Sequence, residues 1–178
     1  PLPAAKVHRV LDGQLGTKWR ERFTEFDDTP VASASIGQVH KGVWRDGRPV
    51  AVKIQYPGAD EALRADLKTM RRLTSVLRQL APGADVQGVV DELVERTEME
   101  LDYQLEANNQ RAFAKAYEGH PHFLIPHVVG SAPKVMVSEW IDGGIPLAEI
   151  IRHGTQEQRD ISGTRLFELT FDAPKRVG

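Results

Sequence analysis

Apolar residues recur every three or four positions along much of this chain, the period of amphipathic helices with one buried side. Over 60–80, for example, Leu63, Leu67 and Met70 begin a stripe that continues for about five turns. The helices that this spacing predicts cover 3–15, 17–23 (a short turn), 60–80, 86–117, 147–151 and 156–171.

Shorter runs rich in valine and isoleucine predict strands before and after the two long helices. The expected strands cover 31–35, 40–44, 49–55, 125–129 and 134–140, with a turn over 130–133 joining the last two. Asp46-Gly47 is a strong hairpin signal between the second and third strands. This order predicts an α+β fold with a five-stranded antiparallel sheet and the helices on one face.

Bulk composition narrows the classes of function. The chain has 178 residues, a net charge of -2 and no cysteine. Its size suits one domain or one lobe, and its charge does not favour nucleic acid as a partner. Disulfides and thiolate metal sites are excluded, and no apolar run reaches the ~20 residues of a membrane-spanning helix. The ends at Pro1 and Gly178 suggest a fragment of a longer protein.

Lys53 is the first candidate for chemistry. In the run from Val50 to Ile54, the strand period of two places Ala51 and Lys53 on one face and the three apolar residues on the other. A small alanine beside an ammonium leaves room for a flat ligand. A lysine that snorkels from an edge strand would explain the same pattern.

The segment from Ala32 to Gly37, Ala-Ser-Ala-Ser-Ile-Gly, precedes this strand. Small side chains let backbone amides approach phosphate oxygens, and Gly37 offers a position where φ can be positive. An ordinary hairpin between strands is the competing interpretation. Because alanine is less permissive than glycine, a phosphate-binding loop of this composition would be stiffer than a glycine-rich one.

An acidic partner for Lys53 is expected on the helix predicted over 86–117. Asp102 and Glu106 are four residues apart and therefore share one side of a helix, beside the apolar stripe. A solvated acidic face is the alternative. The acidic residues considered are Glu95, Glu98, Glu100, Asp102 and Glu106.

Three motifs together resemble the UbiB (AarF, ADCK) family of atypical kinase-like proteins. They are Ala-Ser-Ile-Gly-Gln-Val-His at 34–40, Val-Ala-Val-Lys-Ile-Gln-Tyr-Pro-Gly at 50–58 and Glu-Leu-Asp-Tyr-Gln-Leu-Glu-Ala-Asn at 100–108. The resemblance runs in order from about Phe26 to the end. It implies a kinase-like fold with an alanine-rich loop, binding of ATP or ADP with Mg²⁺, and a role in isoprenoid quinone (ubiquinone-type) biosynthesis.

The resemblance also implies roles for individual residues. Lys53 would contact the phosphates and pair with Glu106, and these two are the expected catalytic residues. Glu100 and Asp102 would form the family's regulatory Glu-x-Asp motif. The expected nucleotide-binding residues are Ala32, Ser33, Ala34, Ser35, Ile36 and Gly37 in the loop, Val39 and Ala51 around the adenine ring, Lys53, and the backbone of Glu139 and Ile141 at the hinge.

The hinge assignment rests on the segment from Val135 to Ile141, with Ser138 as gatekeeper. A buried strand that ends at a turn is the alternative for this segment. His120, His122 and His127 cluster before it, and we interpret them as an ordinary exposed loop rather than a metal site.

Parts of the family's pattern are missing. No Lys-x-Gly-Gln motif precedes Phe26, and no catalytic-loop aspartate or Asp-Phe-Gly motif is present. The organisation expected is a helical N-terminal extension over 1–25, a kinase-like N-lobe over 26–141 and the start of a helical C-lobe over 142–178. Alone, this chain is not expected to transfer phosphoryl groups, and Mg²⁺ would be held mainly by residues outside it.

The leading hypothesis is therefore the ATP-binding lobe of a UbiB-type atypical kinase or ATPase. The alternative is a non-catalytic, pseudokinase-like nucleotide or lipid sensor whose helices over 60–118 dock a partner or a membrane surface. A ligand-free helical scaffold would leave the Lys53 pattern unexplained. The expected partners are a nucleotide, then lipid or quinone-pathway proteins. The expected location is the cytoplasm, at the periphery of the inner membrane.

Overall fold

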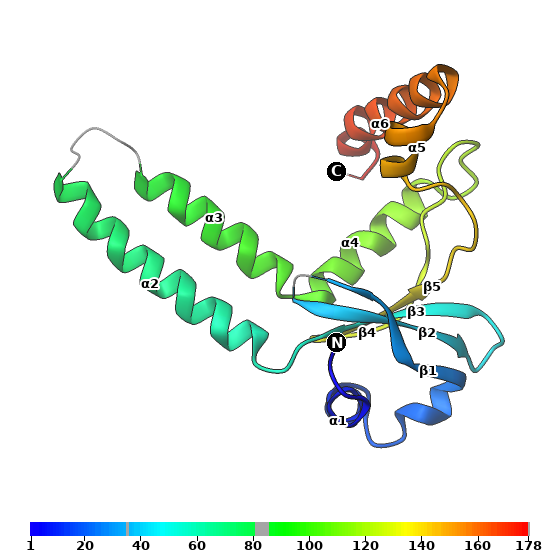
Figure 1. Cartoon of the computed structure of the whole chain (residues 1–178), viewed down its shortest axis with the longest axis horizontal. Helices are drawn as coiled ribbons and strands as arrows, with labels where there is room; N and C mark the ends of the chain where they lie inside the picture. The colour runs from blue at the N-terminus through cyan, green and yellow to red at the C-terminus, as the bar shows by residue number, and fades with distance from the viewer. Residues whose placement is uncertain (35, 81–85, 178) are drawn as a thin grey trace.

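The computed structural model describes residues 1–34, 36–80 and 86–177 of the chain. Within them, a five-stranded antiparallel sheet has the strand order β1-β2-β3-β5-β4, accompanied by six α-helices and one short 3-10 helix, η1 (Trp19–Arg22) (Figure 1). The predicted α+β class is thus confirmed. The strands are β1 (Phe23–Ser33), β2 (Gly37–Trp44), β3 (Pro49–Gln55), β4 (Val128–Ala132) and β5 (Val135–Glu139). The helices are α1 (Ala4–Leu15), α2 (Ala59–Leu80), α3 (Val86–Glu100), α4 (Tyr103–Ala116), α5 (Leu147–His153) and α6 (Gln156–Val177).

The core lies against the face of the sheet that α1 covers. Val50, Val52 and Ile54 of β3 are fully buried there, together with Val7 and Leu11 of α1. These α1 residues are four apart and share one side of the helix, so their burial is what the amphipathic spacing predicts.

The opposite face of the sheet is covered by α4. Tyr103 and Ala107 at the start of this helix pack on Met136 of β5. The expectation that all helices lie on one face is therefore wrong. Apolar spacing shows that a helix has a buried side, but it does not specify which face of the sheet that side covers.

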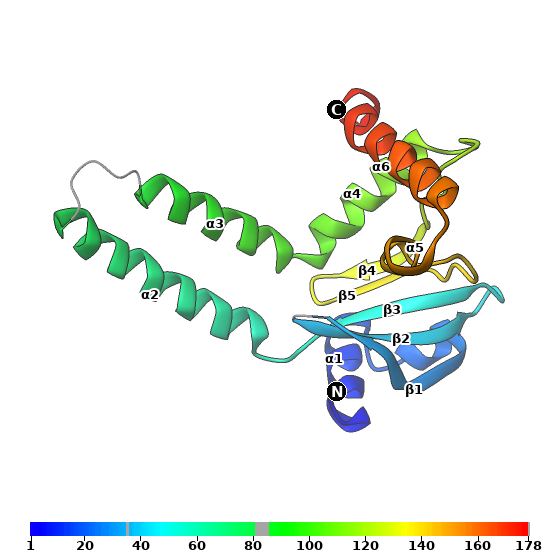
Figure 2. The ribbon, with the colours of Figure 1, turned by 45° about the horizontal axis from the view of Figure 1, so that its top comes forward.

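The long helices α2 and α3 lie side by side and extend away from the sheet in both views (Figures 1 and 2). Leu67 and Val94 are buried, and ion pairs at Arg64–Glu98 (3.8 Å) and Arg71–Asp91 (3.4 Å) join the two helices. This pair of helices leads the chain out from the end of β3 and returns it to the sheet at α4. None of the helices in the described ranges is long and apolar enough to cross a membrane.

The single long helix expected over 86–117 is wrong, because the helix breaks at Leu101 and Asp102. The Asp102 side chain accepts hydrogen bonds from the backbone N–H groups of Gln104 and Leu105, and thus caps the N-terminus of α4. The junction is also bound to the sheet, because Gln55 Nε2 donates to the Leu101 carbonyl (3.0 Å).

Several strand and helix boundaries also differ from the prediction. Strand β1 begins at Phe23 rather than at residue 31, and the β4–β5 turn falls at Pro133 and Lys134 rather than over 130–133. Helix α6 continues through Pro174 to Val177. The predicted end of the first long helix at Pro82-Gly83 lies outside the described residues.

Candidate functional site

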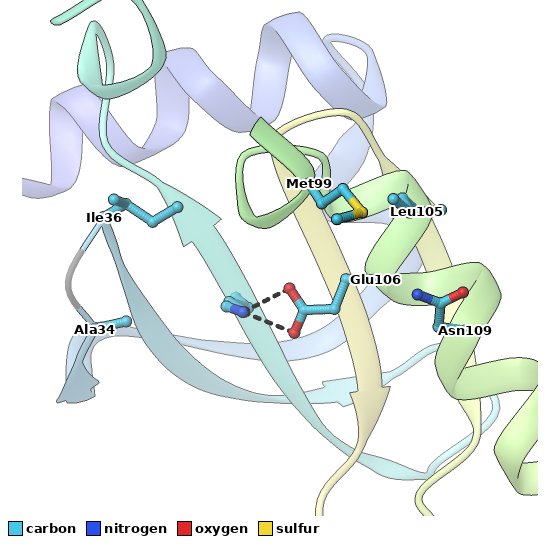
Figure 3. Close-up of a pocket in the computed structure, with 7 residues that line it drawn as sticks. Ala34, Ile36, Met99, Leu105, Glu106 and Asn109 are labelled. Atoms are coloured by element: carbon cyan, nitrogen blue, oxygen red, sulfur yellow. Dashed lines mark hydrogen bonds and ion pairs between the residues drawn. The ribbon is translucent and has the colours of Figure 1, made fainter. Parts of the chain in front are cut away.

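A cavity of about 440 Å³ lies where the β1–β2 hairpin faces the α3–α4 junction. The β1–β2 connection, β3, α3 and α4 all contribute to its walls. In Figure 3, Glu106 projects from α4 toward β3, with Ala34 and Ile36 on the hairpin side. The lining residues are Ala34, Ile36, Lys53, Met99, Leu105, Glu106 and Asn109.

Lys53 and Glu106 form an ion pair in this cavity. The Lys53 ammonium Nζ lies 2.7 Å from each carboxylate oxygen of Glu106, and the two side chains are 27% and 39% exposed. Strand β3 fixes Lys53 between Val39 of β2 and Met136 of β5. The structure thus brings together the two residues that the sequence predicted as a pair, while their contact with phosphate stays a prediction.

Asp102 sets where Glu106 lies. As the N-cap it begins α4, and its carbonyl accepts a hydrogen bond from the Glu106 backbone N–H (3.1 Å) in the first turn. The other half of the expected Glu-x-Asp motif, Glu100, is the last residue of α3, and its side chain lies outside the described part of the chain. The motif therefore spans the junction between two helices.

Tyr103 is a site residue that our sequence reasoning missed. It is fully buried, and Lys53 Nζ lies 4.5 Å from the centre of its ring. Burial raises the pKa of the Tyr103 hydroxyl to about 12, with the negative charge of Glu106 as a further cause, so the phenol is neutral at physiological pH. The available signal was its place directly after Asp102 in the third motif.

Glycine is required at position 37 because neighbouring atoms lie close to its Cα, and not because its backbone angle φ is positive. It is not among the glycines with positive φ, so the expectation of a left-handed position is wrong. A Cβ at this residue would lie 2.4 Å from the Ile54 carbonyl oxygen and 2.9 Å from the Tyr103 hydroxyl. Only a residue without a side chain allows β2 to begin this close to β3 and α4.

The small-residue segment forms a tight hairpin connection. Ala32 and Ser33 belong to β1 and pair with Val39 and Gln38 of β2. The Ala34 N–H donates to the Gly37 carbonyl (2.8 Å), and this amide is therefore already used within the hairpin. Ser35 lies outside the described residues. Of the expected loop residues, Ala34 and Ile36 line the cavity.

The residues expected around adenine lie beside the cavity. Ala51 is paired with Ser138, and Val39 with Lys53, in the sheet ladders. Directly paired residues share a face, so Val39, Ala51 and Ser138 are on the same side of the sheet as Lys53. The structure places them on one surface, and their contact with a nucleobase stays a prediction.

The Glu139 carboxylate has a structural role at the end of β5, where the hinge is expected. It accepts hydrogen bonds from the His127 backbone N–H (3.0 Å) and from Arg48 Nη1 (3.1 Å), and the His127 ring lies 3.0 Å away. The hydrogen bond from the His127 backbone is the largest cause that lowers the pKa of Glu139. Ile141, the other expected hinge residue, is 45% exposed. The hydrogen bonds to adenine that we expect from these two backbones stay predictions.

Comparison with known proteins identifies the family. Residues 1–173 match the ABC1 atypical kinase-like domain. The chain is 33% identical over 162 residues to the mitochondrial atypical kinase COQ8B of Danio rerio, and the match covers 90% of this chain and 26% of that protein. It is 34% identical over 127 residues to the mitochondrial atypical kinase COQ8 of Saccharomyces cerevisiae, where the match covers 71% of this chain and 25% of the relative.

A solved structure is similar over the whole chain. It is described as the complex of Rv3197 with erythromycin from Mycobacterium tuberculosis, and it superposes with a TM-score of 0.92 at 80% sequence identity. The match covers 100% of this chain and 45% of that one. The chain thus spans about a quarter of the length of the two curated relatives and less than half of the solved structure. From the extent of these matches and the kinase-like arrangement of the sheet, Lys53 and Glu106, we conclude that this chain belongs to the ABC1 (UbiB) family of atypical kinase-like domains.

Proposed function

We propose that this chain is the nucleotide-binding lobe of an atypical kinase or ATPase that supports isoprenoid quinone synthesis. The observation that carries the proposal is the Lys53–Glu106 ion pair in a cavity under the β1–β2 hairpin. In protein kinases the corresponding pair must form before the lysine can act on the nucleotide phosphates.

The geometry of Lys53 suits a phosphate ligand. A lysine ammonium has three N–H donors, and Glu106 takes two of them. The third can reach a phosphate oxygen, while Glu106 holds the ammonium in place. Because the Ala34 amide already bonds to Gly37, Lys53 would carry more of the phosphate binding here than in a site with a glycine-rich loop.

The cavity fits Mg²⁺ only as a partner of the nucleotide. Mg²⁺ prefers oxygen ligands, and the lining supplies the Glu106 carboxylate and the Asn109 amide oxygen. Glu106 is occupied by Lys53, so Asn109 is the residue of this chain best placed to assist. Bound Mg²⁺ would neutralise phosphate charge, with the nucleotide and residues outside this chain providing most of its ligands.

The test is nucleotide-dependent thermal stability of the native polypeptide that carries this sequence. ATP or ADP with Mg²⁺ should raise the melting temperature, and Lys53→Ala should abolish the increase. Lys115→Ala is the matched control, because Lys115 is an exposed lysine near the end of α4. If millimolar nucleotide gives no shift, or if Lys53→Ala keeps the full shift, the proposal is wrong.

A macrolide is a second candidate ligand, favoured by the 80% identical structure described as an erythromycin complex. The same thermal assay with erythromycin separates the two. If erythromycin raises the melting temperature of both the wild type and Lys53→Ala, macrolide binding would lie outside the Lys53 cavity. If Lys53→Ala abolishes the erythromycin-dependent rise in melting temperature, macrolide binding would lie inside the cavity.

A further inference from the structure

Lys53 is held from two directions by neighbouring residues of one helix. Glu106 binds its N–H groups, and the ring of Tyr103 lies under the same ammonium, with 4.5 Å between Nζ and the ring centre. Residues three apart on a helix share a side, so the first turn of α4 supplies both contacts. The negative face of an aromatic ring attracts a cation, and the attraction is stronger away from water.

The Tyr103 ring is itself held firmly. Its side chain is fully buried against Ala107 and Met136, and its backbone N–H donates to the Pro133 carbonyl (3.3 Å). A rigid ring can restrict the lysine, whose four-carbon side chain would otherwise rotate about the Glu106 carboxylate.

The far end of Tyr103 reaches the hairpin. Its hydroxyl lies 2.9 Å from the position that a Gly37 Cβ would occupy. Among the described residues this buried hydroxyl has no hydrogen-bond partner. One side chain therefore touches the start of β2 at one end and lies under Lys53 along its face.

We propose that Tyr103 is a positioning residue that holds the Lys53 ammonium at a fixed place for a nucleotide phosphate, an inference that rests on the proposed function. The aromatic ring does the positioning. The hydroxyl is not needed for it, because it makes no hydrogen bond among the described residues.

The experiment compares Tyr103→Phe, Tyr103→trifluorophenylalanine and Tyr103→Leu in the native polypeptide that carries this sequence. The first keeps the ring, the second keeps the shape of the ring but removes its negative face, and the third removes the ring. Tyr117→Leu is the matched control, because Tyr117 ends the same helix and is also a buried tyrosine whose hydroxyl has no partner among the described residues.

Two readouts separate this inference from the proposed function. The first is the rate at which an amine-acylating reagent labels Lys53 without nucleotide, measured by mass spectrometry. The second is the Kd for ADP with Mg²⁺, measured by calorimetry. Tyr103→Phe should leave both within about twofold of wild type. The fluorinated and leucine variants should speed labelling and weaken ADP binding by about 3- to 30-fold, the range that loss of one cation–π contact allows.

The labelling result decides the inference even if no nucleotide binds. Faster labelling in the fluorinated variant, with Tyr103→Phe and Tyr117→Leu unchanged, supports positioning by the ring, and absent ADP binding would then contradict only the proposed function. Equal labelling in the Phe and fluorinated variants would overturn the inference. Because these two side chains have nearly the same shape, the comparison remains valid if Tyr103→Leu does not fold.

Discussion

Lys53 on β3 and Glu106 on α4 are 53 residues apart in the sequence, yet their charged groups meet at 2.7 Å. The helices α2 and α3 fill the interval between them and project away from the sheet (Figure 1). The pair is therefore formed by the return of the chain at α4.

The Lys53–Glu106 pair should contribute modestly to stability, because its side chains are 27% and 39% exposed. In a double-mutant cycle of Lys53→Met and Glu106→Gln, we expect a coupling of about 0.5–1 kcal/mol in the free energy of unfolding, measured with urea. The exposed pair Arg96–Glu92 on α3 is the control, with an expected coupling of about 0.3–0.5 kcal/mol. A coupling energy of several kcal/mol between Lys53 and Glu106 would contradict the expectation that the ion pair contributes only modestly to stability.

Gly37→Ala should destabilise the protein by about 1–3 kcal/mol, because the new methyl group would overlap the Ile54 carbonyl and the Tyr103 hydroxyl. Urea unfolding measures the change. Gly13→Ala is the control of opposite sign: Gly13 lies inside α1 with open space around its Cβ position, so alanine should stabilise by about 0.5–1 kcal/mol. If Gly37→Ala were neutral, the close approach would not explain this glycine.

Asp102→Ala should cost about 1 kcal/mol of unfolding free energy, since it removes the N-cap of α4. Asp102→Asn keeps an oxygen that can accept the Gln104 and Leu105 N–H groups, and should stay near wild type in the same urea titration. Equal losses in the two variants would show that the charge of Asp102, rather than its capping oxygen, is what matters.

Glu139 should make stability depend on pH at the acid end. Its pKa in the folded protein is lowered from the ordinary 4.5, chiefly by the hydrogen bond from the His127 backbone. Its contribution is therefore complete above about pH 4.5 and is lost as the pH falls through the lowered folded pKa. Glu139→Gln should lower the unfolding free energy more at pH 7, where the carboxylate is charged, than at pH 2, as measured by urea unfolding at both values.

Glu118→Gln, a change of an exposed carboxylate, is the control for Glu139 and should stay within about 0.5 kcal/mol of wild type at both pH values. A loss in Glu139→Gln that is the same at pH 7 and pH 2 would mean that the side chain acts through packing and not through its charge.

Much of the fold follows from local pattern. The period of two in β3 correctly placed Val50, Val52 and Ile54 on the buried face and Lys53 on the other. Such alternation is readable because one face of β3 packs on the buried core, whereas the other face is half-buried and carries Lys53 into the cavity. Strand β1 is an edge strand with shifts in its pairing and mostly exposed residues, so it has no alternation, and its start at Phe23 could not be predicted.

Local pattern was enough to predict the α+β class, the approximate place of most strands and helices, and the partners Lys53 and Glu106, because periodicity is local and the pairing came with a family motif. Three features became visible only in the folded protein: the break at Asp102, the placement of α1 and α4 on opposite faces of the sheet, and the position of Tyr103 under Lys53. The junction and the start of α4 make contacts with Gln55 and Pro133, which are distant in sequence from α4, and α1 packs in the core against β3. Contacts with residues that are distant in sequence produce no periodic pattern of apolar residues. Periodicity alone therefore cannot predict a helix end or a ring contact that depends on them.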